Sequence, residues 1–394
     1  MRILVSLFGL QVGGSQINAI EIAGELARHG HEPIIYAPDG PLRGLIAKLG
    51  LTHVQPGPAR DRHPPTAAGA RALTELVRRR GIDLVHAYEW SPTLEAAYGP
   101  YLRLGVPLLS TVYSVIIARG VPSRVPMIVG FEGDAEVARR RGWRPVHVVA
   151  PPIDTDANAP VAQSGPARGR LGLAADELAV VLVSRLAHDL KREGILAAVR
   201  AAGIVSPDLR LRLVIVGDGP CRDEIEAAAA QTNGLLARAA VTLVGEMLDP
   251  RDAYAAADIV LGMGTSAMKG MAFGKPVIVQ GERGFWEVST AGNLPSFLRH
   301  NFYGIGDGTD GAPALAQLIT QLAADRHAWP ELADYGRQTT VALFSNDAAG
   351  RKVATVCEQV AAARPSIGRR LRNLVVPTAF VARHRAVELA RRMR

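Results

Sequence analysis

Short apolar runs alternate with longer, Ala-rich segments of helical period along almost the whole chain, and this alternation constrains the fold more than any other feature. In the first half, the runs that we predict as strands cover residues 3–8, 33–37, 84–87, 106–111, 127–130 and 146–150. In the second half, they cover residues 178–185, 211–217, 241–245, 258–263 and 276–281. Apolar, β-branched runs joined by crossover helices are typical of parallel sheets covered on both faces. Two such series predict an α/β protein with two Rossmann-like, doubly wound domains.

The domain boundaries are predicted from the same pattern. The helices that we predict between the strands include residues 15–29, 67–80, 134–141, 193–203 and 220–230. Residues 151–168 have no apolar period and are rich in Pro, Ala, Gly and Asp, as linkers are. We place an N-terminal domain at 1–160 and a C-terminal domain at 161–345, followed by a closing helix at 346–363 and a basic helical tail at 364–394.

Cysteine content and hydropathy exclude several classes of protein. Only Cys221 and Cys357 are present, which is too few for a disulfide framework or a four-ligand zinc site. This favours a reducing, intracellular setting, and we expect a cytoplasmic protein. The longest uncharged stretch, residues 3–20, is interrupted by glycines and polar residues, so we predict no transmembrane helix.

The formal net charge of +8 belongs to the tail and not to the body. Residues 364–394 contain nine of the 45 basic residues, all Arg, and one of the 37 acids, Glu388. The remaining chain therefore carries 36 basic and 36 acidic residues. A protein that binds nucleic acid should have a basic face on its body, so we expect no nucleic-acid partner.

Ligands of open parallel sheets bind beyond the carboxyl ends of the strands, and a cleft between two such domains is a natural site. After the first predicted strand, Gly13 and Gly14 lead into a helix. Glycines there allow a ligand to approach the backbone, and a helix start favours an anion. Their spacing is not the GxGxxG fingerprint of dinucleotide-binding proteins, and a plain tight turn is the alternative interpretation.

Two cations flank the short loop after the predicted strand at 178–185. Arg185 offers a planar fork of donors and Lys191 a point charge, and together they suit a diphosphate. Two solvated side chains would give the same pattern.

A second anion site is predicted after the strand at 258–263. Thr265 or Ser266 can cap the helix that follows Gly264, which leaves backbone amides directed at a ligand. Lys269 lies one helical turn further on and adds a positive charge. Capping alone would also explain Thr265 and Ser266. Two anion-binding loops in one domain predict one phosphorylated ligand.

No metal site is predicted. Asp154 and Asp156 have the Asp-x-Asp form, but they lie in the linker and not after a central strand. The ten histidines show no ligand spacing such as HExxH.

The ordered motifs of this chain resemble those of the GT-B glycosyltransferases, specifically the retaining family 4, also called glycosyl transferases group 1. The matching segments are Gly13-Gly14, LVHA (84–87), PPIDT (151–155), SRL (184–186) with Lys191 downstream, LVIVGDGP (213–220), VTLVG (241–245) and KGMAFGKPVIV (269–279). The last three, in this order, are the most specific, and the resemblance extends to about residue 363. It implies the GT-B fold, in which two Rossmann-like domains face a cleft.

The resemblance also implies an activity. A retaining, metal-independent enzyme of the hexosyltransferase type would move a sugar from a nucleotide-sugar donor to an acceptor in glycan biosynthesis. The nucleotide sugar would be a co-substrate, and no cofactor is implied. The C-terminal domain would bind the donor, and the N-terminal domain would bind a sugar, lipid-linked or small-molecule acceptor.

Family roles transfer to individual residues of this chain. Arg185 and Lys191 match the diphosphate pair and would be catalytic, because fixed positive charge stabilises a departing diphosphate. Gly13 and Gly14 match the glycine loop, and Glu246 lies where the backbone meets the nucleobase. The donor-binding residues that we predict are Gly13, Gly14, Arg185, Lys191, Glu246, Gly264, Thr265, Ser266 and Lys269.

The chain departs from the family pattern at two places. Members usually carry two glutamates eight positions apart, but here the second position is Lys269 and the first falls near Leu261 or is deleted. That second glutamate normally binds the ribose hydroxyls. Tyr113 replaces a usual histidine on the N-terminal side, where the acceptor-side candidates are Tyr88, Glu89 and Tyr113. A structural role is the alternative for each of the three.

Two further hypotheses compete with an active glycosyltransferase. The lost glutamates and histidine would also fit a catalytically silent GT-B subunit, and another GT-B enzyme, such as a nucleotide-sugar epimerase, shares the fold. Arg185 and Lys191 favour an enzyme, because a scaffold has no need to hold a diphosphate.

The basic tail lies beyond the family resemblance. Residues 379–394 predict an amphipathic helix with a mostly Ala apolar face. Such a helix can lie on an anionic membrane surface, which predicts peripheral docking at the inner membrane face. A solvated or body-packed helix is the alternative.

Overall fold

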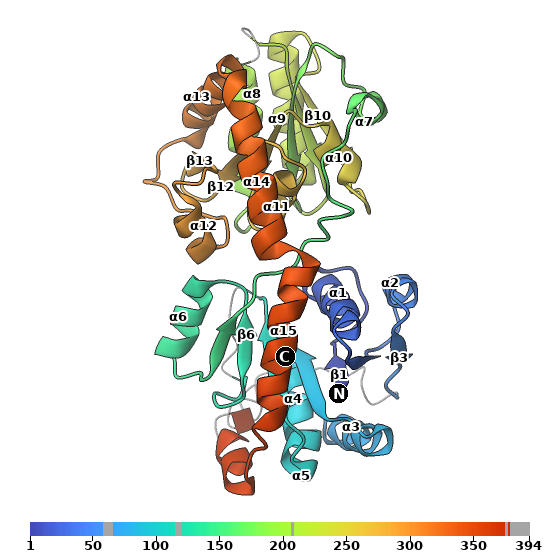
Figure 1. Ribbon diagram of the computed structural model, residues 1–394. Coiled ribbons are helices and arrows are strands. Elements are labelled where there is room, and N and C mark those ends of the chain that lie inside the picture. Colours follow the sequence, from blue (N-terminus) through green and yellow to red (C-terminus); the bar gives the residue numbers. More distant parts are fainter. Residues whose placement is uncertain (58–65, 115–119, 206–208, 375–376, 379–394) are drawn as a thin grey trace, which may run out of the picture. The chain divides into compact units, whose positions relative to one another are not determined.

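The computed structural model describes residues 1–57, 66–114, 120–205, 209–374 and 377–378 (Figure 1). Its contacts divide the chain into an N-terminal unit, Met1–Pro152 with Asn346–Arg394, and a C-terminal unit, Ile153–Ser345. The division comes earlier than the predicted boundary between residues 160 and 161. The reason is that Ile153 forms a parallel bridge with Ser345, and its N–H donates to the Phe344 carbonyl at 2.7 Å.

The N-terminal unit is built on a parallel sheet of seven strands. In spatial order, these are β3 (Thr52–Val54), β2 (Glu32–Tyr36), β1 (Arg2–Ser6), β4 (Leu84–Tyr88), β5 (Leu108–Val112), β6 (Met127–Val129) and β7 (Val146–Val148). The chain moves outward from β1 to β3 and then crosses to β4 on the other side of β1. The topological switch point, where ligands of such sheets bind, is therefore between β1 and β4.

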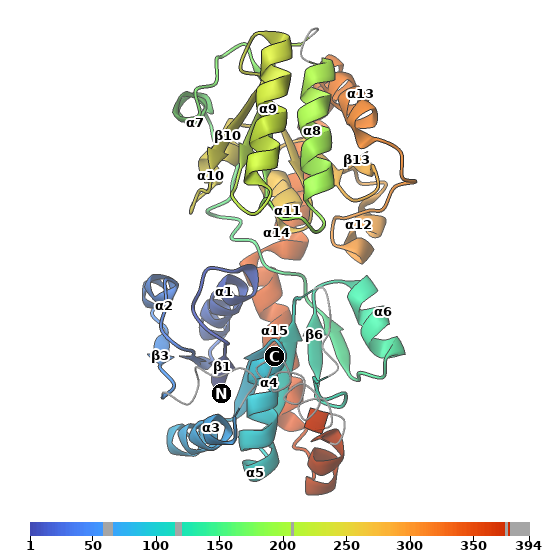
Figure 2. The same cartoon turned by 180° about the vertical axis from the view of Figure 1, so that it is seen from behind.

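Helices cover both faces of this sheet. They are α1 (Gly14–Arg28), α2 (Arg43–Lys48), α3 (Ala67–Arg80), α4 (Trp90–Ala96), the π-helical η2 (Ala97–Tyr101), α5 (Leu102–Leu104), α6 (Glu132–Arg140) and α15 (Asn346–Ala362). Ile3 and Val5 pack in one core with α1 and α15, which lie side by side in Figure 1. Leu4, which lies between them in β1 and faces the other side of the sheet, packs in another core with α3. The view from behind in Figure 2 shows α3 and α4 on that opposite face.

The C-terminal unit repeats the architecture with six strands. In spatial order, these are β10 (Val241–Gly245), β9 (Leu211–Val216), β8 (Leu178–Val183), β11 (Ile259–Gly262), β12 (Val277–Gln280) and β13 (Trp286–Val288). The strands run parallel except for β13, which pairs antiparallel with β12. The switch point is between β8 and β11, because the chain moves from β8 to β10 before it crosses to β11.

The helices of this unit also form two layers. They are α7 (Gly165–Arg170), α8 (Arg192–Val205), α9 (Arg222–Leu236), α10 (Arg251–Ala256), α11 (Thr265–Ala272), α12 (Leu294–His300), α13 (Gly311–Ala324), the 3₁₀ turn η3 (Arg326–Ala328) and α14 (Trp329–Phe344). Ile259 and Leu261 pack in one core with α8, α9 and α13, and Figure 2 shows α8 and α9 side by side. On the other face, Gly270 of α11 lies so close to Val260 that an added Cβ would contact it at 2.8 Å.

The predicted α/β class with two doubly wound units is therefore confirmed. Two strands were not predicted, β3 and β13, because each is a short edge strand, THV and WEV, that contains no apolar run. The closing helix appears as α15 and packs in the N-terminal core through Val353 and Cys357. None of the described helices combines the length and apolarity that a membrane span requires. The tail helix predicted at 379–394 lies outside the described residues.

Candidate functional site

A cavity of about 350 Å³ opens at the switch point of the C-terminal unit. It receives the loops after β8, β9, β10 and β11, all of which leave the carboxyl edge of the sheet. Its lining includes five of the predicted donor-binding residues, namely Arg185, Glu246, Thr265, Ser266 and Lys269. The structure therefore brings the two predicted anion loops together, and two cations from different strands share one cavity.

The loop that carries Arg185 is fixed by the loop after β9. The Ser184 N–H donates to the Val216 carbonyl at 3.0 Å, and the Leu186 N–H donates to the Asp218 carbonyl at 2.9 Å. These bonds require a close approach at Gly217, whose φ is +144°. A Cβ on Gly217 would overlap the Ser184 carbonyl oxygen. The glycines of the LVIVGDGP motif thus allow two loops to meet and position Arg185.

Lys191 lies just before α8 and is not among the residues that line the cavity. The Lys191 ammonium is nevertheless close enough to Arg185 for their charges to interact. Burial lowers the pKa of Lys191 to about 8, and the charge of Arg185 lowers it further. The Lys191 carbonyl accepts a hydrogen bond from the Gln280 amide at 3.2 Å. A half-buried Lys191 beside an exposed Arg185 forms a site that favours an anion.

The start of α11 corrects one prediction. Neither Thr265 nor Ser266 caps the helix; the N-cap is Gly264, with φ +54° and no capping side chain. The Ser266 hydroxyl instead bonds to the Met263 backbone, accepting from its N–H at 3.1 Å and donating to its carbonyl at 3.0 Å. The reason is that the chain turns at Gly264 in the left-handed region, so the helix begins before either hydroxyl reaches the cap position. Thr265 is exposed at the cavity.

A second cavity, of about 650 Å³, lies in the N-terminal unit at its own switch point. Four lining residues come from the loop after β1 and from α1, namely Phe8, Gly14, Ser15 and Gln16. The others are Glu89 after β4, Trp90, Ser91 and Pro92 at the start of α4, and Tyr113 and Ser114 after β5. The predicted Gly14, Glu89 and Tyr113 are therefore together. Neither Gly13, which is extended at φ −168°, nor Gly14 has a positive φ. A turn that requires glycine therefore does not explain Gly13 and Gly14. An added Cβ at Gly14 would meet no atom within 4 Å, so the space beside it is open to a ligand.

Glu89 is the centre of the polar side of this cavity. Its backbone has φ +65°, which is an uncommon conformation for a residue with a side chain. Its carboxylate accepts from the Ser15 hydroxyl at 3.0 Å, the Tyr113 N–H at 3.1 Å and the Ser114 hydroxyl at 2.7 Å. One side chain thus connects the loops after β1, β4 and β5. Strain of this kind often accompanies functional sites.

The two predicted tyrosines differ in their surroundings. Tyr88 is 2% exposed within the sheet core and does not line the cavity. It therefore packs in the core and is not placed to contact an acceptor there. Burial raises the pKa of Tyr88 and of Tyr113. Tyr113 does line the cavity, and its buried hydroxyl has no hydrogen-bond partner among the described residues.

Two family models match the chain. The first, described as Glycosyltransferase Family 4, matches residues 12–129, and the second, described as Glycosyl transferases group 1, matches residues 177–325. The first match contains every lining residue of the N-terminal cavity except Phe8, and the second contains all those of the C-terminal cavity. The chain belongs to glycosyltransferase family 4. This glycosyltransferase is accordingly a transferase of the GT-B fold.

Individual relatives agree with this assignment. A D-inositol 3-phosphate glycosyltransferase of Thermobispora bispora is 25% identical, over 78% of this chain and 82% of that protein. A glycosyltransferase from Rickettsia africae has a TM-score of 0.72 at 16% identity, covering 91% of this chain and 98% of the other. Anabaena Alr3699/HepE, solved in complex with UDP-glucose, has a TM-score of 0.70 at 17% identity, covering 91% and 100%. These two structures share the fold with the glycosyltransferase.

Several residues of the two cavities were not predicted. Ser15 and Ser114 bind Glu89, while Asp218 and Tyr254 line the donor-side cavity. The position of Ser15 directly after Gly14 was the available signal for this residue. Asp154, excluded above as a metal ligand, accepts from the N–H groups of Asp156 and Ala157 in a local turn.

Proposed function

We propose that this glycosyltransferase binds a nucleotide-sugar donor in the 350 Å³ cavity of its C-terminal unit and transfers the sugar, a hexose, to an acceptor. The observation that carries the proposal is the grouping of Arg185 and Lys269 in one cavity, with Lys191 close enough to Arg185 for their charges to interact. Solved neighbours with UDP or UDP-glucose support this class of donor. The family resemblance supports retention of configuration and independence from metal ions.

The cations have separate roles in this proposal. Arg185 offers two parallel N–H groups to the diphosphate, and Lys191 adds a compact charge beside it. Both interactions strengthen as the sugar–phosphate bond breaks and negative charge grows on the leaving group. Lys269 lies in the last turn of the two-turn helix α11 and lines the same cavity, and the N-terminus of this helix also favours an anion. Glu246, exposed at the cavity, lies beside the nucleobase.

The N-terminal cavity would hold the acceptor, which we propose to be a sugar, a lipid-linked molecule or a small molecule with free hydroxyls. The Glu89 carboxylate and the Ser15 and Ser114 hydroxyls offer the donors and acceptors that bind hydroxyl groups. Phe8, 52% exposed, adds an apolar surface at the same cavity.

Release of nucleoside diphosphate tests the proposed function. A thermal-shift panel of nucleoside diphosphates first identifies the base. A ligand that binds only the folded state raises the midpoint temperature of unfolding by mass action, so the preferred base gives the largest increase. Incubation with the matching nucleotide sugars and acceptors should then release nucleoside diphosphate. Donor binding without release under every acceptor would favour the silent-subunit hypothesis, and an altered sugar on an intact nucleotide would favour an epimerase.

Donor affinity should fall as pH rises, because Lys191 loses its charge. The pKa of Lys191 is lowered to about 8, so the cation is mostly present below that pH and absent above it. We expect the Kd for nucleoside diphosphate to rise about tenfold between about pH 7.5 and pH 9. Calorimetric titration across this range measures it. Lys191→Arg, which stays charged, should flatten the profile, and an equally steep profile in this variant would contradict the assignment.

Replacing Lys269 by glutamate should weaken donor binding, although it restores the residue usual in the family. Lys269 lines the donor cavity, so the reversed charge would repel a diphosphate. We expect the Kd for nucleoside diphosphate to rise about tenfold or more. Lys352→Glu makes the same charge change on an exposed face of α15 and should leave the Kd unchanged. Tighter binding in Lys269→Glu would show that the lysine has no role toward phosphate.

The membrane partner, the cytoplasmic location and the role in glycan biosynthesis stay predictions of this proposal. The predicted amphipathic helix lies outside the described residues. The described start of the tail packs on the N-terminal unit through hydrogen bonds of Arg370 and Asn373.

A further inference from the structure

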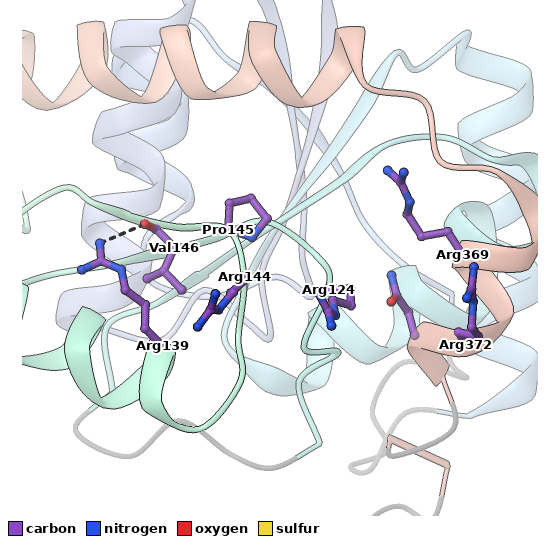
Figure 3. A pocket seen from close by; sticks show the side chains of 8 residues that line it. Arg124, Arg139, Arg144, Pro145, Val146, Arg369 and Arg372 are labelled. Atoms are coloured by element: carbon purple, nitrogen blue, oxygen red, sulfur yellow. Dashed lines mark hydrogen bonds between the residues drawn. The ribbon is translucent and has the colours of Figure 1, made fainter.

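An arginine-lined cavity of about 880 Å³ lies in the N-terminal unit, apart from both cavities described above (Figure 3). Its lining comprises Arg124, Arg139, Arg144, Pro145, Val146, Arg369, Arg372 and Asn373. Figure 3 shows Arg139 and Arg144 toward one end, Arg369 and Arg372 toward the other, and Arg124 between them. We call this group the arginine pocket. No carboxylate occurs among these described lining residues.

The arginine pocket is at the edge of the sheet opposite to the switch point. Arg124 precedes β6, and Arg144 and Pro145 precede β7, so they mark the amino ends of these strands. The predicted acceptor residue Glu89 instead follows β4 at the carboxyl edge. The pocket is therefore separate from the acceptor cavity and does not depend on the proposed function.

The start of the basic tail completes the pocket, because residues 367–374 form a helical segment packed on the N-terminal unit. The Arg370 guanidinium donates to the Leu102 carbonyl at 2.8 Å, and the Asn373 amide donates to the Tyr101 hydroxyl at 2.7 Å. Leu374 is 6% exposed in the same core as Leu73. These contacts direct the neighbouring Arg369 and Arg372 to the pocket.

The positive charge in the pocket is largely uncompensated. Arg139 pairs with Glu132 and also donates to the Val146 carbonyl at 3.2 Å. Arg124, Arg144, Arg369 and Arg372 are exposed, and none of them forms an ion pair within the described part of the chain. Like charges gathered around one cavity repel each other, and a bound anion would remove that repulsion.

We infer that the arginine pocket binds a phosphate-bearing anion with more than one negative charge. Guanidinium groups bind phosphate oxygens through two parallel N–H bonds and are the usual choice for such ligands. Five of them around 880 Å³ offer more donors than one phosphate can use, so a diphosphate or a similar group fits better. The phosphate belongs either to a soluble molecule or to a lipid headgroup.

Inorganic pyrophosphate and the double variant Arg369→Gln/Arg372→Gln test the site in the full chain. The two residues lie on the exposed tail side, and neither is assigned to the donor or acceptor cavities. We expect the Kd for pyrophosphate at the arginine pocket to rise about tenfold in the double variant. The measurement is made in an Arg185→Ala background, which weakens pyrophosphate binding at the donor cavity and keeps that contribution the same in every protein compared.

Arg71→Gln/Arg80→Gln is the matched control. It removes the same charge from the exposed face of α3, outside the pocket. Binding of pyrophosphate should be unchanged in this control, and the rate of sugar transfer by the chain with native Arg185 should be unchanged in both double variants. Equal pyrophosphate affinity in all three proteins would overturn the inference, as would binding too weak to detect in each.

Vesicles distinguish the two sources of phosphate. Co-sedimentation is compared for phosphatidylcholine vesicles with and without phosphatidic acid. Binding to phosphatidic acid that Arg369→Gln/Arg372→Gln weakens, and the control pair does not, identifies a lipid headgroup as the ligand. Pyrophosphate binding that depends on Arg369 and Arg372, with no dependence in the vesicles, identifies a soluble ligand. If Arg369→Gln/Arg372→Gln binds both pyrophosphate and phosphatidic acid vesicles as the native chain does, the site is contradicted for both sources.

Discussion

Arg185→Ala is expected to lower the rate of sugar transfer by about 10²- to 10³-fold, as removal of a fixed charge-stabilising donor does in other active sites. Arg185 is exposed at the donor cavity. It acts on a diphosphate whose charge increases as the bond to the sugar breaks, so the loss should appear in kcat more than in the KM of the acceptor. Steady-state release of nucleoside diphosphate measures both constants.

The matched control for this variant is Arg200→Ala. Arg200 belongs to α8 of the same unit and forms an ion pair with Asp310 at 2.8 Å, with both side chains about half exposed. An exposed pair of this kind contributes little to stability, so Arg200→Ala should transfer sugar at the native rate. If Arg185→Ala keeps a rate within about threefold of the native enzyme, the assignment of Arg185 to the leaving group is incorrect.

Gly217→Ala should damage the C-terminal unit and donor binding together. The backbone at Gly217 has φ +144°, and a Cβ would overlap the Ser184 carbonyl oxygen. We expect a loss of about 2–4 kcal/mol in stability, and the surviving folded protein should bind nucleoside diphosphate more weakly because the loop of Arg185 has moved. Urea unfolding and calorimetric titration measure the two effects.

Gly234→Ala separates this effect from a general effect of glycine replacement. Gly234 lies in α9 of the same unit, its φ is not positive, and an added Cβ would meet no atom within 4 Å. Alanine is favoured over glycine in a helix by about 0.5–1 kcal/mol, so this variant should be slightly more stable and should bind donor normally. Equal destabilisation by both replacements would disprove the role given to the contact at Gly217.

The strands were predictable because each carries a local signal. The runs at 84–87 and 241–245 coincide with β4 and β10 to within a residue, since parallel strands covered on both faces must be apolar throughout. The short edge strands β3 and β13 have no such run. Their pairing depends on the neighbouring strands β2 and β12, which are defined only after the sheet has formed.

The candidate site was predictable where its residues follow the carboxyl end of a predicted strand. Arg185, Glu246 and Lys269 follow β8, β10 and β11 and meet at one cavity. The cap of α11 was predicted incorrectly, because the choice between Gly264 and the two hydroxyls depends on a left-handed backbone that the residue types alone do not determine.

The arginine pocket could not be predicted from the sequence. Arg124 and Arg144 are separated from Arg369 by more than half of the chain, and each is an ordinary exposed arginine when considered alone. What brings them together is the packing of residues 367–374 through Asn373 and Tyr101. That contact joins a tail, in which only charge was evident, to a specific surface of the N-terminal unit.

A crystal structure of the enzyme with bound nucleoside diphosphate would show whether the C-terminal unit holds the donor diphosphate beside Arg185. The quantity to measure is the distance from the Arg185 guanidinium nitrogens to the nearest diphosphate oxygens. We expect two such distances of about 3 Å, with the base beside Glu246. A diphosphate bound outside this cavity, with Arg185 making no contact to it, would show that Arg185 does not stabilise the leaving group.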